Sequence, residues 1–84
     1  MKKIVDVEGE GFMALLGERV TLFCMNYFYT GILTGVNKED LLLTNPSIVY
    51  ETGSFSEKAW KDAQPLPGPI YVRISAIEAY GIIK

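Results

Sequence analysis

Apolar and polar residues alternate with a period of two in the middle of the chain, which is the pattern of a β-strand. Between residues 29 and 34, every second side chain falls on the same side of an extended chain, so that Tyr29, Gly31 and Leu33 share one face. The polar cluster Asn-Lys-Glu-Asp at 37–40 predicts a turn before the next apolar run. Gly31 inside the strand predicts a bulge or a sharp bend, as a small barrel requires.

The same pattern predicts one short helix followed by five strands. The apolar stretch Phe12–Leu16 is preceded by acidic residues and followed by Gly17, which is typical of a helix of about one and a half turns. The segment 45–47, Asn-Pro-Ser, interrupts the third strand and predicts a bulge or a kink, because proline lacks the donor that a sheet needs. The expected strands are 19–25, 27–34, 41–52 with this interruption, 70–73 and 76–83.

Residues 52–69 are rich in glycine, serine and proline and are expected to form a long variable loop. Within them, the segment 57–63 has the composition of one helical turn, with Ser56 as its N-cap. Trp60 either folds back to hold the loop or marks a contact site, and the first is the commoner role. Residues 1–10 are expected to be a tail or a short edge strand. The length of 84 residues corresponds to one domain.

The composition is that of a folded domain with an apolar surplus. Hydrophobic residues make up 49% of the chain and charged residues 21%, which is too apolar for a disordered segment. The surplus favours a surface that faces another chain. The net charge is −2 and the lysines and arginines do not cluster, unlike those of a dedicated nucleic-acid binder. In a ring, however, one arginine per subunit becomes a circle of positive charge.

The residue types present exclude several kinds of chemistry. The chain has no histidine, which removes histidine acid–base catalysis, Ser-His triads and the commonest metal ligand. The single Cys24 lies within a strand pattern and is expected to be a small buried hydrophobe. Glu39 and Asp40 are adjacent on a polar turn, where carboxylates are usually solvated rather than catalytic. We therefore predict a protein that is not an enzyme and uses no metal and no cofactor.

The chain also lacks the apolar runs of a membrane protein. A membrane-spanning helix needs about 18 consecutive apolar residues, and no apolar run in this chain approaches that length. The short apolar patch after Lys2 and Lys3 is cut by acidic residues, so it does not have the pattern of a signal peptide. We therefore expect a cytoplasmic protein without a membrane partner.

Two sets of residues follow sequence motifs that occur together at a defined spacing. The first motif is an apolar alternation followed by aromatic-x-Gly-x-apolar, with Gly31 at its glycine, and the second is apolar-Arg-Gly-x-x-apolar, with Arg73 at its arginine. The matching residues are Val20, Leu22, Cys24, Tyr29, Gly31 and Leu33 in the first motif and Val72, Arg73 and Ile77 in the second. The two motifs resemble those of the Sm and Sm-like (LSm) family, which includes the Hfq-like proteins. Compared with that family, Asn37 replaces an aspartate and Leu41 an asparagine in the loop of the first motif, and Ile74 replaces the glycine of the second.

The resemblance implies a mostly β fold, in which a short N-terminal helix precedes a five-stranded, strongly bent antiparallel open barrel of the SH3-like class. In this family the fourth strand of one subunit pairs with the fifth strand of the next, and closed rings of five to eight subunits result. Such a homo-oligomeric ring pairs the short apolar edge strands that otherwise invite aggregation. The interface residues expected from this resemblance are Ile70, Tyr71, Val72, Ala76, Ile77, Tyr80 and Ile82.

The resemblance also implies a ligand, because family members hold single-stranded RNA around the pore of the ring. An alternative keeps the ring but replaces RNA by a protein partner at the loop 52–69, since Leu41 cannot hydrogen-bond a base. Two further alternatives are a monomeric SH3-like barrel with a peptide-binding face and, least favoured, an enzyme that uses carboxylates. The RNA-binding candidates that the resemblance implies are Asn37, Lys38, Arg73 and Ser75.

Overall fold

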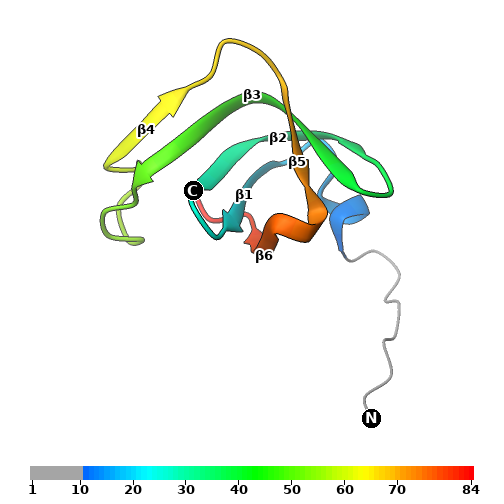
Figure 1. Ribbon diagram of the computed structural model, residues 1–84. Coiled ribbons are helices and arrows are strands. Elements are labelled where there is room, and N and C mark those ends of the chain that lie inside the picture. The colour runs from blue at the N-terminus through cyan, green and yellow to red at the C-terminus, as the bar shows by residue number, and fades with distance from the viewer. Residues whose placement is uncertain (1–10) are drawn as a thin grey trace.

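Residues 11–84 of the computed structural model form a six-stranded antiparallel sheet that bends strongly on itself (Figure 1). Two short 3-10 helices accompany the sheet, one before the first strand and one before the last. The strands are β1 (Arg19–Cys24), β2 (Phe28–Val36), β3 (Asp40–Glu51), β4 (Asp62–Pro65), β5 (Ile70–Arg73) and β6 (Ile77–Gly81), and the helices are η1 (Phe12–Leu15) and η2 (Ile74–Ala76).

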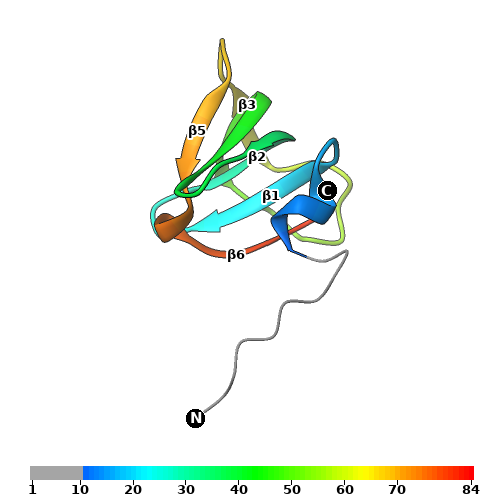
Figure 2. The ribbon, with the colours of Figure 1, turned by 90° about the vertical axis from the view of Figure 1, so that its right-hand side faces the viewer.

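The long strand β3 pairs with two other strands, β4 and β5, along one of its edges. The sheet order is β4-β3-β2-β1-β6, and β5 pairs with β3 as well. The first part of β3 pairs with β5, beginning at Asp40↔Arg73, and its second part pairs with β4. At the opposite edge of the sheet, β6 runs beside β1 (Figure 2). No pairing joins β5 to β6 within residues 11–84, so the barrel remains open between these two strands.

A bulge in β3 produces the bend that lets one strand pair with two others. The register between β2 and β3 shifts there, so that Asn45 and Pro46 together stand opposite Gly31. Asn45 has a φ of 48°, in the left-handed region that asparagine tolerates. A Cβ on Gly31 would lie 3.2 Å from the Cα of Pro46 and 3.2 Å from the Cβ of Leu43. The expected break in the third strand and the expected bend at Gly31 are therefore confirmed as two sides of one bulge.

The main core lies on the inner face of the bent sheet, where the apolar members of the alternating pattern meet. Leu22, Leu33, Leu41 and Leu43 are completely buried and come from three neighbouring strands. Burying a side chain of this kind contributes about 1.5–3 kcal/mol relative to leaving it in water. Val20, Cys24 and Val72 complete this cluster, and the half-buried Phe12, Leu15, Tyr29, Val36, Ile70, Ile74 and Ile77 pack against it.

A second apolar layer covers the outer face of the same strands. Phe23 stacks on Phe28 with ring centroids 4.5 Å apart, and the register puts Phe28 beside the buried Val49. The ring of Phe55, from the loop that follows β3, lies 6.4 Å from the ring of Phe23. The loop after β3 is therefore packed onto the sheet, and it is held there by aromatic contacts.

The expected N-terminal helix over 12–16 is wrong, because the structure has a single 3-10 turn, η1, of four residues. Gly11 stands at its N-cap with a φ of 83°, and no side chain caps the turn. Gly17 then adopts a φ of 86°, and its N–H donates to the Leu33 carbonyl at 2.7 Å, which draws the chain into the sheet. A helix this short makes too few hydrogen bonds to be stable by itself. The hydrogen bond between Gly17 and the sheet therefore sets the residue at which the helix ends.

The expected number of five strands is also wrong, because β4 forms within the segment 52–69 that was expected to be a loop. The residues of β4 carry no strand pattern, yet they pair with the second half of β3 as far as Glu51. The helical turn expected over 57–63 does not form, and the chain there bends before it enters β4. Residues 1–10, expected as a tail or an edge strand, lie outside the described residues.

Gly31→Ala is expected to destabilise the fold by about 1–3 kcal/mol, because the new Cβ would press on the backbone of the bulge. Urea unfolding followed by circular dichroism should show a lower midpoint with an unchanged slope. Gly68→Ala is the matched control, since nothing lies within 4 Å of a Cβ there. Its stability should stay within about 0.5 kcal/mol of the wild type or rise slightly. Equal midpoints for Gly31→Ala and the wild type would contradict this account of the bulge.

Candidate functional site

Two turns that are far apart in the sequence meet and enclose a polar pocket of about 440 Å³, which we call the turn pocket. One turn joins β2 to β3 and is closed by the Asn37 N–H, which donates to the Asp40 carbonyl at 2.8 Å. The other is η2, whose Ile74 N–H donates to the Glu39 carbonyl, also at 2.8 Å. The pairing of β3 with β5 therefore holds the two turns side by side. The turn pocket is lined by Lys38, Glu39, Asp40, Arg73, Ile74 and Ser75.

The turn pocket carries two cationic and two anionic side chains. Lys38, Glu39 and Arg73 are exposed, and Asp40 is half-buried. None of these four makes an ion pair within residues 11–84, where the one ion pair joins the end of β3 to the residue before β4. An arginine and a lysine can bind a phosphate or a carboxylate, whereas two carboxylates oppose any anion. The arrangement therefore favours a ligand that presents one anionic group beside neutral polar groups.

The structure brings most of the RNA-binding candidates together. Lys38, Arg73 and Ser75 line the turn pocket although they come from separate halves of the chain. Asn37 begins the same turn but is not among the lining residues. Leu41, which follows the turn, is completely buried in the main core. The position that stands for a base-reading residue in the Sm-like resemblance is therefore closed to any ligand in this chain.

The seven expected interface residues lie on or beside β5 and β6, each of which keeps one edge without a partner within residues 11–84. Val72 is buried in the main core, and Ile70 and Ile77 are half-buried against it, so these three stabilise the fold of the single chain. Tyr71 is 64% exposed and Ile82 is 58% exposed, and both present large apolar side chains to the surface. The other exposed members of the set are Ala76 and Tyr80.

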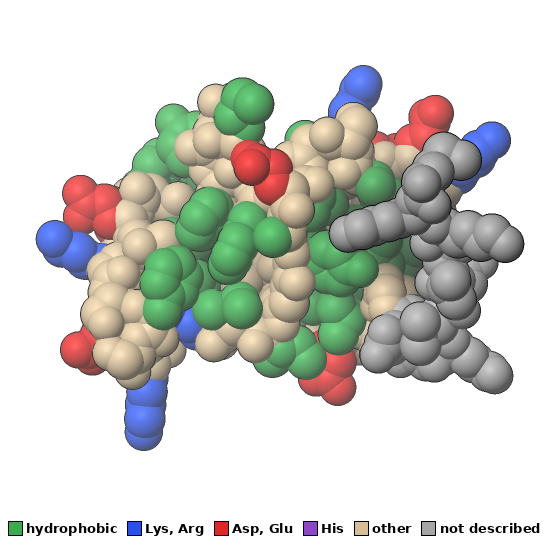
Figure 3. Space-filling model, turned by 90° about the horizontal axis from the view of Figure 1, so that it is seen from below, with side chains coloured by type: hydrophobic (Ala, Val, Ile, Leu, Met, Phe, Trp, Pro, Cys, Tyr) green, Lys and Arg blue, Asp and Glu red, His purple; other side chains and the backbone are tan. Residues whose placement is uncertain are grey.

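A larger and mostly apolar groove of about 740 Å³, the edge groove, lies where the sheet fails to close. Its walls come from the end of β1, the start of β2, and from β3, β5 and β6. Tyr29, Ile48 and Leu66 contribute apolar surface to it, while Arg73 and Glu78 are its charged members. Hydrophobic side chains also gather on the face of the molecule shown in Figure 3. Sequence reasoning missed Leu66, because it lies in a proline-rich segment that has no periodic pattern.

Cys24 lines the edge groove as a protonated thiol. Burial raises the pKa of the Cys24 thiol above its ordinary value, and the Glu78 carboxylate contributes a smaller rise. Burial is also the main reason that the pKa of Tyr29 is raised. Both groups are therefore neutral at pH 7, and neither provides the anion that a nucleophile or a base needs.

The structure contains no assembled metal site or membrane helix in the part of the chain that it describes. Among residues 11–84, no group of three or more histidine, cysteine, aspartate or glutamate side chains is placed to hold a metal ion. Neither of the two 3-10 helices in this range is long and apolar enough to cross a membrane.

Comparisons with known proteins were made on the whole sequence and on the structure. They found no match among protein-family models, among curated proteins or among solved structures. The resemblance to the Sm and Sm-like family therefore rests on the motif residues of this chain alone.

Cys24 is expected to react with iodoacetamide at least about tenfold more slowly in the native protein than in urea, because burial shields the thiol and keeps it protonated. The native reaction should accelerate only above the pH range in which an ordinary thiol ionises. Glu78→Gln removes the nearby carboxylate and should move this pH dependence to lower pH, whereas Glu57→Gln should not, because Glu57 is not among the groups that raise the pKa of Cys24. Mass spectrometry of the alkylated chain gives the rates. Equal rates in native and unfolded protein would contradict the burial of this thiol.

Proposed function

We propose that this chain is a non-enzymatic, ring-forming protein of the Sm-like type that binds single-stranded RNA at its turn pockets. The observation that carries this proposal is the turn pocket itself, in which Lys38, Arg73 and Ser75 converge beside strands with unpaired edges. A ring built through those edges would repeat the pocket around a common axis. Several weak sites would then act together on one RNA strand.

The strand arrangement supports the proposed ring. β5 and β6 each keep one edge without a partner within residues 11–84. Pairing β5 of one copy with β6 of the next is a head-to-tail contact, which closes into a ring when the rotation between copies fits. Such pairing would satisfy backbone groups that otherwise invite aggregation, and it would cover exposed side chains such as Tyr71.

The charges of the turn pocket determine what kind of RNA recognition is possible. Arg73 can hold a phosphate through two parallel hydrogen bonds, and Lys38 adds a second cation. Glu39 and Asp40 weaken this attraction, so a single pocket would bind RNA poorly. Leu41 lies inside the core, and the pocket would therefore select the charge of the RNA backbone rather than the edge of a base.

A ring that binds a protein instead of RNA is the second candidate. It is favoured by the net charge of −2 and by the acidic half of the turn pocket, both of which repel phosphate. Its partner would contact the loop within 52–69, where Phe55 is 52% exposed. A ring that binds no RNA at low salt would favour this second candidate over the first.

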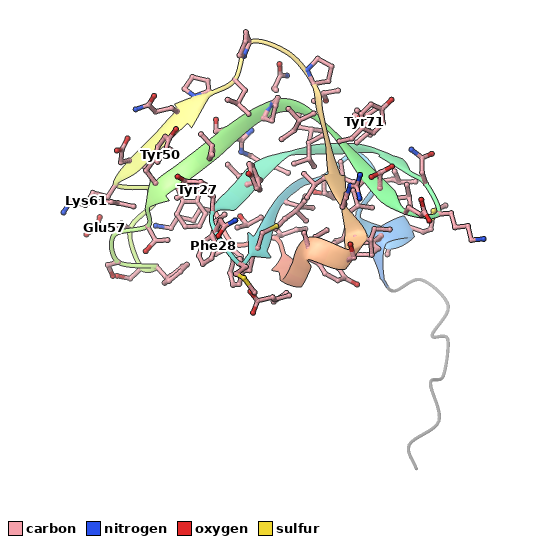
Figure 4. All side chains as sticks on the ribbon, viewed as in Figure 1. Tyr27, Phe28, Tyr50, Glu57, Lys61 and Tyr71 are labelled. Atoms are coloured by element: carbon pink, nitrogen blue, oxygen red, sulfur yellow. The ribbon has the colours of Figure 1, made fainter. Side chains whose placement is uncertain are left out.

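Native mass spectrometry is expected to find a closed ring of one defined mass. Tyr71→Lys should convert the ring to monomers, because it places a charge on the exposed surface of the β5 edge. Tyr50→Lys is the matched control, since Tyr50 is also exposed but lies far from Tyr71 (Figure 4). The control should keep the mass of the ring. A monomeric wild-type protein would rule the ring out.

Short single-stranded RNA is expected to bind the ring in a salt-sensitive manner, and Arg73→Ala should weaken this binding about tenfold or more at low salt. The slope of log K against log salt should fall by about 0.7 for each phosphate contact that is lost. Lys61→Ala removes a cation outside the turn pocket and should leave both quantities unchanged. Fluorescence anisotropy measures both. If the two substitutions weaken binding equally, the RNA does not bind at the turn pocket.

A further inference from the structure

The ammonium group of Lys84 donates three hydrogen bonds to one loop, residues 52–61, which joins β3 to β4. A lysine ammonium group has three N–H donors and no acceptor, so these bonds match its full hydrogen-bonding capacity. Every acceptor is a backbone carbonyl oxygen, whose position is fixed by the path of the loop. The acceptors belong to Thr52 at 3.3 Å, Ser54 at 2.9 Å and Ala59 at 3.1 Å.

Two aromatic rings of the same loop face the ammonium group. The Nζ atom of Lys84 lies 4.4 Å from the centre of the Trp60 ring and 5.6 Å from the centre of the Phe55 ring. Both distances fall within the about 6 Å over which a cation is attracted to the face of an aromatic ring. The two rings contact each other edge to face, with centroids 5.9 Å apart. We call these three carbonyls and two rings the ammonium cage.

The ammonium cage is built by the loop itself. The Lys61 N–H donates to the Thr52 carbonyl at 3.3 Å and closes the loop at its base. Inside the loop, the Glu57 N–H donates to the Ser54 carbonyl at 3.1 Å, and the Ser54 and Ser56 hydroxyls lie 2.7 Å apart. The pairing of β3 with β4 fixes both ends of the loop. None of these contacts involves Lys84, so the Thr52 and Ser54 carbonyls are also held by bonds within the loop.

The groups of the ammonium cage select a primary ammonium ion on the surface of the protein. A quaternary ammonium has no N–H for the carbonyls, and a guanidinium spreads its donors in one plane instead of directing three from one nitrogen. Residues 53–59 are exposed. Figure 4 shows Glu57 and Lys61 of this loop at the outer end of the molecule. A lysine side chain from another molecule can therefore reach the cage.

We propose that the ammonium cage is a binding site for a lysine side chain, which Lys84 fills in cis, and that it accepts a lysine of another polypeptide once the Lys84 ammonium group is neutralised or displaced. In the intact chain Lys84 competes as a tethered ligand, at an effective concentration of about a millimolar or more. The cage is therefore closed to weak ligands until Lys84 leaves it. It would work in the same way in a monomer or in a ring, with or without RNA.

Trp60 provides the readout, because it is the only tryptophan of the chain and forms one wall of the cage. In Lys84→Met, which keeps an apolar stem but removes the ammonium group, N-acetyl-lysine-N-methylamide should change the Trp60 fluorescence along a saturable curve. The wild type should respond with a midpoint at least about tenfold higher, because Lys84 competes for the cage. Tetramethylammonium, which has no N–H donor, should give no saturable response in either protein.

Two further variants separate cage binding from a general effect of charge. Lys61→Met removes a lysine at the base of the same loop, where it pairs with Glu51, and should respond as the wild type does. Phe55→Ala in the Lys84→Met background removes one wall and should weaken the binding at least about threefold. Circular dichroism and urea unfolding verify the fold of each variant.

The proposal is overturned if folded Lys84→Met shows no saturable response, if tetramethylammonium gives the same curve, or if the wild type has the same midpoint as Lys84→Met. Lys84 would then act only as a structural contact that holds the loop. If Lys84→Met does not fold, the wild-type titration decides. A saturable response to the lysine compound and none to tetramethylammonium supports the cage, and the absence of any response overturns it.

Discussion

The bend at the β3 bulge is the constraint on which the rest of the structure depends. A flat strand of twelve residues would keep one neighbour along its edge, whereas the bulge opposite Gly31 turns β3 so that its two halves meet different strands. The first half brings Asp40 beside Arg73 and so creates the turn pocket. The second half carries β4 and the loop that forms the ammonium cage. One glycine that faces an Asn-Pro step therefore holds the two candidate sites at opposite ends of one strand.

The sheet builds its core without closing, and this is the source of both the edge groove and the proposed ring. Four leucines are fully buried on the inner face, yet β5 and β6 keep free edges in the described part of the chain. A domain of this size cannot cover all of its apolar surface by itself. A second copy would supply backbone partners and apolar cover at the same place. In the proposed ring, several turn pockets would bind one ligand together, because the mixed charges of a single pocket would bind it only weakly.

The sequence predicted those parts of the fold that local patterns specify. Alternation identified the strands that became β1, β2, β3, β5 and β6, and the turn at 37–40 and the bulge at Pro46 followed from residues with few backbone options. β4 escaped prediction because its residues become a strand only through pairing with β3. The N-terminal helix is shorter than predicted because the Gly17 N–H donates to the Leu33 carbonyl of β2, which ends the helix. Arg73 and Lys38 of the turn pocket were predicted as site residues. The ammonium cage depends instead on the contact between Lys84 and Trp60, which no local sequence pattern indicates.

The pairing of β6 with β1 has a consequence for the order in which the molecule forms. β1, β2 and β3 follow one another closely along the chain, and each pairs with the next, so little chain entropy opposes their association. The partners Thr21 and Gly81, by contrast, come from opposite ends of the described chain. Contacts of such long sequence separation form late and slow the folding of small β domains. During synthesis β6 leaves the ribosome after the other strands. Until β6 docks, the edge of β1 has no partner and can pair with a strand of another molecule.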